Sequence, residues 1–336
     1  MRPWREDPPR PADPGPADAR DLLPDSITDR LSKEARPHRH PHVNSESGEP
    51  PYVGIVGAGS VGTALGVALQ RAGWRVAAVA SRDPGRRARF MALVPGARGF
   101  AEATALLDEV ELVILAVPDD VIATIVQSLR LYGGQALVHT SGLLGADVLL
   151  PAMAAGTQIG GFHPLVAFAD TERAVQALRG ATVAVEGDDE LAGLLADMAD
   201  AIGAVPVRLA PGSKPAYHAA AVLSAGGVVA LLDAVAQLGA VAGLDEASAL
   251  AIYLPLVRQT LDNAAALGVR DALTGPFTRG DVGTLDAHLS ALARHAPGVL
   301  DLYRALGRRE LDIAEQRGTL TPEVARRLAE SLAMGR

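Results

Sequence analysis

The chain contains no cysteine and few aromatic residues. Without cysteine, disulfide bonds and thiolate chemistry are excluded. Only two Trp, five Tyr and five Phe occur in 336 residues, so few side chains can stack on nucleic-acid bases or on aromatic ligands. The composition therefore argues against a nucleic-acid partner and against a large aromatic substrate.

Long charge-free apolar runs are also missing, because alanine and glycine dilute the runs that do occur. The N-terminus also has no hydrophobic segment of the kind that directs secretion. We therefore expect neither a membrane protein nor a secreted one. The formal net charge of −8 gives a second argument against nucleic acid. These absences predict a cytoplasmic protein, and a hydrophobic content of 49% is enough to fill the cores of two domains.

Residues 1–50 are rich in Pro, Arg, Asp and His and have no apolar periodicity. This segment cannot bury enough apolar surface to fold, so we predict a disordered tail. Its "HRHPH" stretch offers His38, His40 and His42, but nothing fixes their geometry for a metal ion. We expect no metal site in this protein.

From Tyr52 onward, short β-branched runs alternate with amphipathic segments, which is the pattern of βαβ units with a parallel sheet. The candidate strands lie at 52–57, 75–80, 112–117, 135–140, 158–163, 181–186 and 204–209. Beyond them the sequence reads as helices rich in Ala and Leu. We predict an α/β fold: a tail over 1–50, a Rossmann-type parallel-sheet domain that binds a dinucleotide over 51–210, and an all-helical domain for substrate and dimerisation over 211–336.

A glycine motif follows the first predicted strand and opens a helix. Gly57, Gly59 and Gly62 form G-x-G-x-x-G. In this position the first glycine makes a tight turn, the second admits the pyrophosphate of a dinucleotide, and the third lets helix and strand approach. We expect Ser60 and Val61, which lie between the last two glycines, to contact the cofactor as well.

The second predicted strand is followed by Ser81 and Arg82, where an NAD enzyme usually has an acidic residue for the ribose hydroxyls. A hydroxyl and a guanidinium can bind a 2′-phosphate that a carboxylate would repel, so the pattern favours NADP(H). The alternative is that Asp83 turns inward and Arg82 is only solvated. Arg86 and Arg87 either add to the phosphate pocket or solvate a helix.

Three further strand ends carry candidate residues. Val117 and Pro118 follow the strand beyond the topological switch point, where the loop is expected to pass the nicotinamide. Ser141, in "HTSG", either offers its hydroxyl to substrate or caps the next helix. His163, in "GGFHPL", lies either at the mouth of the ligand crevice or buried in support of a domain junction.

A helix is predicted to begin at Lys214, because Ser213 is a good N-cap and Pro215 is tolerated in a first turn. The helix dipole disfavours a cation there. His218 lies one turn later on the same face. These two residues are either a solvated lysine and a satisfied histidine, or a pair that acts on substrate.

The segment "ALTGPFTRGDVGTLDAHL" contains a Gly/Pro-shaped loop with Arg279. A guanidinium in such a loop is suited to bidentate binding of a substrate carboxylate. The alternative is a surface pair between Arg279 and Asp281 that orders the loop. We expect Asp281 or Thr284 to cap the helix that follows.

Taken in order, these motifs resemble a known group of proteins. They are "GIVGAGSVGTAL", "AVPDDVI", "HTSG", "FHPL", "KPAYHAAAV" and "LTGPFTRGD", within residues 51–310. The chain resembles the Rossmann-like oxidoreductases that carry a C-terminal domain of unknown function, which are related to 6-phosphogluconate and β-hydroxyacid dehydrogenases, pyrroline-5-carboxylate reductases and ketopantoate reductases. In the β-hydroxyacid dehydrogenases a helix begins G-x-K-x-x-x-N, with the lysine as acid/base and the asparagine binding substrate. Gly212, Lys214 and His218 stand in these places, and histidine for asparagine is a departure.

The resemblance implies an NADPH-dependent reductase with Lys214 as general acid/base, His218 or Ser141 orienting a carbonyl, and Arg279 binding a carboxylate. A small 2-oxo acid is the expected substrate, with ketopantoate as the first compound to test. The alternatives are an imine reductase, a prephenate-type dehydrogenase, and an NADP-binding sensor or scaffold without catalysis. The apolar helix over 218–232 further predicts a homodimer built through the C-terminal helices.

Overall fold

The structure, a computed structural model, describes residues 50–333. The chain divides after Ala221 into two compact units. The sequence pattern predicts a domain boundary near residue 210. The structure instead keeps the first residues of the helix that begins at Lys214 in the same unit as the sheet. The tail predicted for residues 1–50, with His38, His40 and His42, lies outside the described residues except for Pro50.

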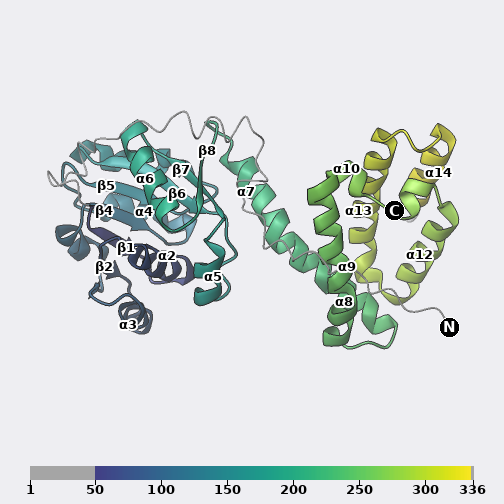
Figure 1. The fold of residues 1–336 in the computed structure, drawn as a ribbon, viewed down its shortest axis with the longest axis horizontal. Helices are drawn as coiled ribbons and strands as arrows, with labels where there is room; N and C mark the ends of the chain where they lie inside the picture. The colour runs from purple at the N-terminus through teal and green to yellow at the C-terminus, as the bar shows by residue number, and fades with distance from the viewer. Residues whose placement is uncertain (1–49, 334–336) are drawn as a thin grey trace, which may run out of the picture. The chain divides into compact units, whose positions relative to one another are not determined.

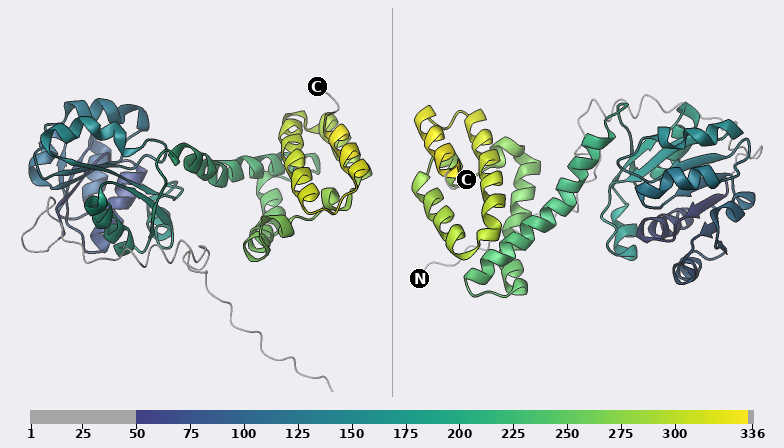
Figure 2. Two further views of the ribbon diagram at one scale, coloured as in Figure 1. Left: turned by 90° about the horizontal axis from the view of Figure 1, so that it is seen from above. Right: turned by 180° about the vertical axis from the view of Figure 1, so that it is seen from behind.

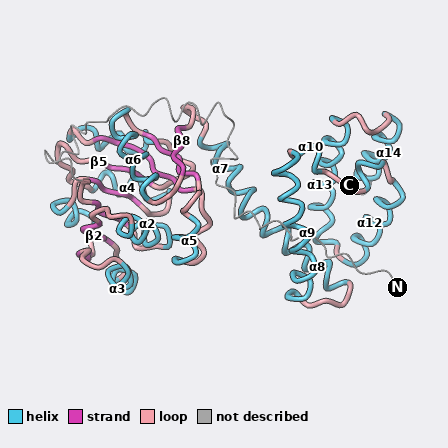
Figure 3. The backbone as a smooth tube through the Cα atoms, in the orientation of Figure 1, coloured by secondary structure: helices cyan, strands magenta, loops and turns pink. Residues whose placement is uncertain are grey.

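The first unit is built on an eight-stranded sheet in the order β3-β2-β1-β4-β5-β6-β7-β8. Figures 1 and 3 show the sheet with the helices around it. The strands are β1 Val53–Val56, β2 Val76–Ala80, β3 Arg98–Phe100, β4 Leu112–Leu115, β5 Ala136–His139, β6 Gln158–Pro164, β7 Thr182–Glu186 and β8 Val205–Arg208. All seven predicted strands are present. Strand β3 was not predicted, because it has only three residues, lies at the sheet edge and has no fully buried side chain.

Neighbouring strands are parallel except for β6 and β7, which are antiparallel. The register aligns one residue of each strand from β3 to β7 in a single row, which we call the edge row. It consists of Phe100, Ala80, Val56, Leu115, His139, Gly161 and Glu186. Because five of these residues end parallel strands, the edge row marks the carboxyl edge of the sheet, where open α/β folds bind ligands.

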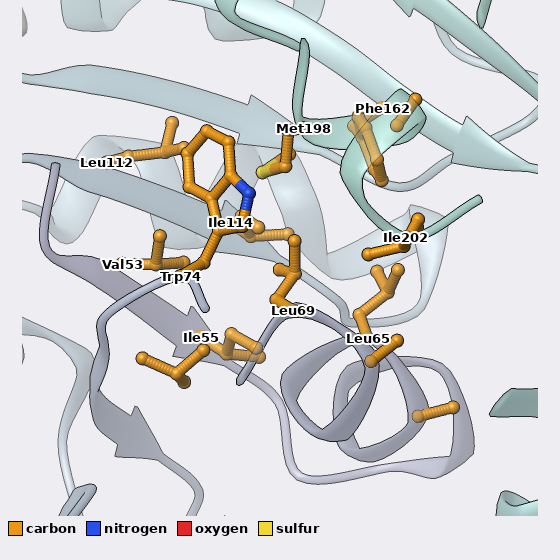
Figure 4. Close-up of a cluster of buried hydrophobic side chains, with 14 of the residues drawn as sticks. Val53, Ile55, Leu65, Leu69, Trp74, Leu112, Ile114, Phe162, Met198 and Ile202 are labelled. Atoms are coloured by element: carbon orange, nitrogen blue, oxygen red, sulfur yellow. The ribbon is translucent and has the colours of Figure 1, made fainter. Parts of the chain in front are cut away.

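Helices cover both faces of the sheet (Figure 2), and the strands are apolar because both faces are buried. One face is covered by α2 Ser60–Arg71, α3 Pro84–Leu93, α5 Thr171–Ala177 and α6 Asp189–Ala201, the other by η2 Ala103–Glu109, α4 Asp119–Ser128 and η3 Ala146–Ala155. Figure 4 shows the first of these cores, where Leu65 and Leu69 of α2 meet Ile55 and Ile114 of the sheet. This layered packing fixes the strand ends.

Helix α7 Lys214–Val222 begins at the predicted residue and continues through a π-helical turn into the second unit. That unit contains η4 Leu223–Gly227, α8 Val228–Val241, α9 Glu246–Leu267, α10 Val269–Ala272, α11 Pro276–Arg279, α12 Val282–His295, α13 Pro297–Gln316 and α14 Pro322–Ala333. Within its described residues it has no strand, which confirms the predicted helical region. Asp281 caps α12 as predicted, accepting the Thr284 N–H at 3.0 Å.

One helix of the described chain, Lys214–Val241, is long and apolar enough to cross a bilayer by length and composition alone. Its most apolar stretch is largely exposed. Such a single helix is weak evidence for a membrane protein.

Candidate functional site

The three glycines after β1 each have a different steric role. Gly57 has φ of +111°, and a Cβ there would lie 2.1 Å from the Ala116 carbonyl oxygen. A Cβ on Gly62 would lie 2.0 Å from the Gly57 carbonyl oxygen. At Gly59 a Cβ would meet no atom within 4 Å. Gly57 and Gly62 are therefore required by the protein's own packing, whereas Gly59 leaves space for a ligand.

The N-terminus of α2 lies next to the space at Gly59 and is suited to bind an anion. Gly59 is the N-cap, no side chain caps the helix, and its first turn has no acidic residue. The N–H groups of a first helical turn have no intrahelical acceptor, and the helix dipole adds positive charge there. Ser60 is exposed and Val61 half-buried, so both can be reached by a ligand. This arrangement fits a pyrophosphate.

At the end of β2, Asp83 is engaged by helix α3. Its carboxylate caps the helix by accepting the Gly85 and Arg86 N–H groups, at 2.8 and 3.0 Å. The Arg87 guanidinium donates to the Ser81 carbonyl oxygen at 2.6 Å. Arg82 is exposed and forms no hydrogen bond or ion pair with any other residue of 50–333. Asp83 is exposed and caps α3, so it does not turn inward, and the binding of a 2′-phosphate by Ser81 and Arg82 stays a prediction.

The loops after β4 and β5 also lie at the edge row. Pro118 is exposed at the N-terminus of α4, and Val117 would contact a Cβ placed on Gly57. Ser141 is buried, and its hydroxyl oxygen accepts the Leu143 and Leu144 N–H groups at 3.1 and 2.9 Å. Its hydroxyl oxygen therefore closes a turn of the loop, but Ser141 does not cap the next helix, η3, whose N-cap is Gly145 and which has no side-chain cap.

His139, in the edge row, is fully buried and has both ring nitrogens engaged. Its Nδ1 accepts the Ser141 N–H at 3.2 Å, and its Nε2 lies 3.1 Å from the Gly145 carbonyl oxygen. The first bond requires an unprotonated Nδ1, so the neutral Nε2–H tautomer fits both contacts. Burial lowers the pKa of His139, and the nearby Lys214 ammonium lowers it further. This histidine supports the loop in its neutral form.

Lys214 is 4% exposed, and its ammonium lies beside Gly161 and Glu186 of the edge row. Its Nζ donates to Glu186 Oε2 at 2.7 Å. A Cβ on Gly161 would lie 2.6 Å from that carboxylate oxygen and 3.4 Å from the Lys214 Nζ. The carboxylate compensates the cation that the helix dipole disfavours. Lys214 is the sole lysine of the described chain, because the other of the two stands at position 33.

His163 and His218 come together around a glycine. Their ring centroids are 5.9 Å apart, edge to face, and His163 Nδ1 lies 3.4 Å from the Tyr217 hydroxyl. A Cβ on Gly142 would be 2.5 Å from His218 Nδ1 and 2.6 Å from His163 Nε2. His218 Nδ1 is buried and has no hydrogen-bond partner within residues 50–333. A buried polar atom without a partner is costly, so this nitrogen is a candidate ligand contact.

Burial lowers the pKa of His139 and of His163, so both rings are uncharged at neutral pH. Burial lowers the pKa of His163 to about 4, and the positive charges of Lys214 and His218 contribute. Lys214 and Glu186 are then the charged pair at its centre. The cluster can hold a proton on the Lys214 ammonium and offer the neutral His163 ring beside it.

The structure brings the predicted residues Lys214, His218 and His163 close together, and their action on a substrate stays a prediction. The structure adds Glu186, Tyr217 and His139, which were not predicted from the sequence. The adjacent glycines of "QIGGFH" were a signal for Glu186, since a side chain on Gly161 would collide with the carboxylate. Arg279 is exposed on α11 in the second unit, so its role with substrate stays a prediction.

Two family models match the chain. Residues 39–164 match the "Rossmann-like domain" and residues 181–310 match the "Domain of unknown function (DUF2520)". His139 and His163 fall in the first match, whereas Glu186, Lys214 and His218 fall in the second. The cluster is therefore assembled from both. A search of the curated proteins found no match.

Several solved structures share the fold. A Bacteroides fragilis protein, provisionally named an NADP oxidoreductase, is 23% identical with a TM-score of 0.65, over 78% of this chain and 98% of that one. A Thermotoga maritima protein is 25% identical with a TM-score of 0.61, over 79% and 99%. The 1-pyrroline-5-carboxylate reductase of Streptococcus pyogenes is 17% identical with a TM-score of 0.53, over 85% and 99%. The chain thus combines a Rossmann-like domain with a C-terminal domain of the DUF2520 family.

Proposed function

We propose that this protein is an NADPH-dependent oxidoreductase that reduces a small carbonyl compound carrying a carboxylate, such as a 2-oxo acid. The observation that carries the proposal is the buried Lys214 ammonium beside Gly161 and Glu186 of the edge row. The glycine loop follows β1 at the same edge, three strand spacings from β6, or about 14 Å. A proton donor and a dinucleotide loop at one sheet edge are what a carbonyl reductase requires.

The residues for the cofactor are those at the ends of β1, β2 and β4. Gly57, Gly59, Ser60, Val61 and Gly62 would hold the pyrophosphate at the N-terminus of α2. Ser81 and Arg82 would bind the 2′-phosphate, and Val117 and Pro118 would border the nicotinamide. NADPH, when bound, supplies the hydride. The provisional name of the Bacteroides fragilis protein agrees with this cofactor.

Lys214 would act as the general acid. As hydride reaches a carbonyl carbon, negative charge develops on its oxygen, and a positioned ammonium stabilises that charge and then donates a proton. His218, whose buried Nδ1 has no hydrogen-bond partner in residues 50–333, would orient the carbonyl, with neutral His163 beside it. Ser141 could add its hydroxyl hydrogen, because only its oxygen is engaged as an acceptor.

The side chains that could line a substrate site indicate the size and the charge of the substrate. Few aromatic residues and many Ala, Val and Leu favour a compact aliphatic compound. Ketopantoate is the first 2-oxo acid to test, with Arg279 proposed to bind its carboxylate. Imine reduction is the second candidate, since a similar structure is a 1-pyrroline-5-carboxylate reductase. Prephenate-type dehydrogenation is the third.

The test is NADPH oxidation by the purified protein with a panel of 2-oxo acids and cyclic imines, followed by substitution of Lys214. Lys214→Ala should lower kcat by about 10²-fold or more and leave the Kd for NADPH nearly unchanged. Lys214→Arg is the matched variant, because it keeps the positive charge beside Glu186 but does not release a proton near neutral pH. Wild-type turnover in either variant would refute the acid role. Tight NADPH binding without turnover of any compound would favour an NADP sensor.

We further propose a homodimer. Large apolar side chains are exposed along neighbouring helices from α7 to α9: Val222, Leu223, Val229, Val241, Ile252, Leu256, Leu261 and Leu267. Leu223 is 71% exposed. A soluble monomer rarely leaves so many apolar side chains uncovered along adjacent helices. Sedimentation at micromolar concentration should give a dimer, which Leu223→Glu should weaken, and a monomeric wild-type chain would contradict the proposal.

A second copy of the chain is a more favourable partner for this exposed apolar surface of α7 to α9 than a lipid bilayer. The helix that could span a membrane begins at Lys214, and its first turn is paired with Glu186 inside the sheet unit. Placing that ion pair in hydrocarbon would be costly. A cytoplasmic location without membrane or nucleic-acid partners stays a prediction. Flotation with lipid vesicles would contradict it.

A further inference from the structure

The contact between Lys214 and Glu186 differs from an ordinary surface ion pair in burial. The Lys214 side chain is 5% exposed and that of Glu186 is 25% exposed. The Glu186 side chain therefore reaches solvent, whereas the Lys214 side chain is almost completely buried. A proton that enters or leaves the Lys214 nitrogen has to pass through a group in contact with it.

The other titratable groups near Lys214 do not provide this passage. His139 on β5 is fully buried and uses both ring nitrogens for backbone contacts. His163 on β6 contacts the Tyr217 hydroxyl, and Asp119 on α4 acts on His163 only through its charge. His218 Nδ1 has no hydrogen-bond partner in the described chain. Within residues 50–333, Glu186 is the titratable side chain hydrogen-bonded to Lys214.

Two adjacent glycines of β6 leave room in the sheet for Glu186 and Lys214. A Cβ on Gly160 would lie 2.4 Å from the Glu186 carbonyl oxygen, and one on Gly161 would lie 2.6 Å from its Oε2. Two adjacent glycines in a strand weaken the strand, because they lack side chains that pack. A buried ion pair is also a weak source of stability, since apolar residues of similar volume often serve as well. A contribution to stability therefore does not account for the pair.

We propose that Glu186 carries protons between solvent and the Lys214 ammonium. The step rests on the proposed function. After Lys214 gives its N–H proton to the substrate oxygen, its nitrogen is a neutral amine. Glu186 then accepts a proton from a hydronium ion on one carboxylate oxygen, and this O–H proton moves to the Lys214 lone pair. The ammonium and the carboxylate are restored, one proton is taken from solvent in each turnover, and no electrons are transferred.

The first test needs no substrate, so it separates this proposal from the proposed reaction. The chain has two lysines, so ¹⁵N-lysine labelling gives two side-chain signals, and Lys214→Arg identifies which belongs to Lys214. We expect Glu186→Gln to slow the exchange of the Lys214 Nζ protons with solvent by about tenfold or more, an effect below that usual for a direct acid or base. If Glu186 only holds Lys214 in place, the same variant loosens the site and exchange becomes faster. Unchanged or faster exchange would overturn the proposal.

The second test uses turnover. With an active substrate, Glu186→Ala should lower kcat about tenfold or more with little change in the Kd for NADPH. Added formate, a small carboxylate that fits the vacated space, should restore part of the lost kcat. Glu172→Ala is the matched control, because Glu172 forms an exposed ion pair with Arg71 elsewhere in the same unit. It should change neither kcat nor the response to formate.

A third variant, Glu186→Asp, tests the relay if Glu186→Gln is unstable. If Glu186→Gln does not fold, Glu186→Asp keeps the charge on a shorter side chain, and it should give exchange slower than the wild type. Wild-type exchange in Glu186→Asp together with failure of formate to rescue Glu186→Ala would overturn the relay. If Glu186→Gln slows the exchange but the wild-type protein reduces no carbonyl or imine, the proton path through Glu186 is supported and the proposed reaction is refuted.

Discussion

Replacing Gly59 by alanine separates the binding role of the glycine loop from its role in folding. Gly59 has φ of −79° and ψ of −172°, which alanine adopts without strain, and the added Cβ would meet no atom within 4 Å. Restricting the unfolded chain should add about 0.4–1 kcal/mol to the free energy of unfolding. Alanine is a poorer N-cap than glycine, which should cost about the same amount. The net change should therefore be within about 0.5 kcal/mol.

The effect on cofactor binding should be much larger. The new methyl group occupies the space in which a pyrophosphate would approach the first turn of α2. We expect the Kd for NADPH to rise at least tenfold, which corresponds to about 1.4 kcal/mol. Titration of NADPH fluorescence measures the Kd, and urea denaturation of the free protein measures the free energy of unfolding.

Two other glycines supply the controls. Gly62→Ala brings a Cβ within 2.0 Å of the Gly57 carbonyl oxygen, so it should lower the free energy of unfolding as well as NADPH binding. Gly298→Ala, at the start of α13 in the second unit, also meets no atom within 4 Å and should leave NADPH binding unchanged. A wild-type Kd for NADPH in Gly59→Ala would refute the assignment of the loop to a pyrophosphate.

Two further predictions concern the cofactor's phosphate and the neutral histidine. NADPH should bind at least tenfold more tightly than NADH, or by about 1.4 kcal/mol, and Arg82→Asp should reverse this preference; equal Kd values in the wild type would contradict it. The pKa of His163 is about 4 in the folded chain and near 6.5 when unfolded, so the unfolded chain binds more protons between these values and the free energy of unfolding should decrease as pH falls from 6.5 to 4. The loss is roughly 3 kcal/mol at most, less because the ring keeps some solvent contact. Urea denaturation across this range should show a weaker pH dependence for His163→Asn than for the wild type or the exposed control His295→Asn, and identical profiles would show that His163 is not the group responsible.

Local sequence features were sufficient to predict most helices and strands and the glycine loop that follows β1. Apolar runs of strand length and the turn residues between them predicted seven strands, and the glycine spacing after the first strand placed the start of α2. Ser213 and Pro215 placed the start of α7 at Lys214. Each of these features depends on residues within a few positions of one another. Strand β3 escaped prediction because three residues at an edge, without a fully buried side chain, carry too short a pattern.

The partner of Lys214 was decided by tertiary structure alone. Glu186 is 28 positions away in sequence, and its contact depends on the alignment of β5, β6 and β7 in the edge row. The reversal of β7 against β6 was equally hidden, because a strand buried on both faces has the same apolar composition in either direction. The meeting of His163 with His218 around Gly142 depends on the same packing. The sequence by itself determined which groups could act, and the register of the sheet determined which of them meet, because strand pairing joins residues that no local pattern connects.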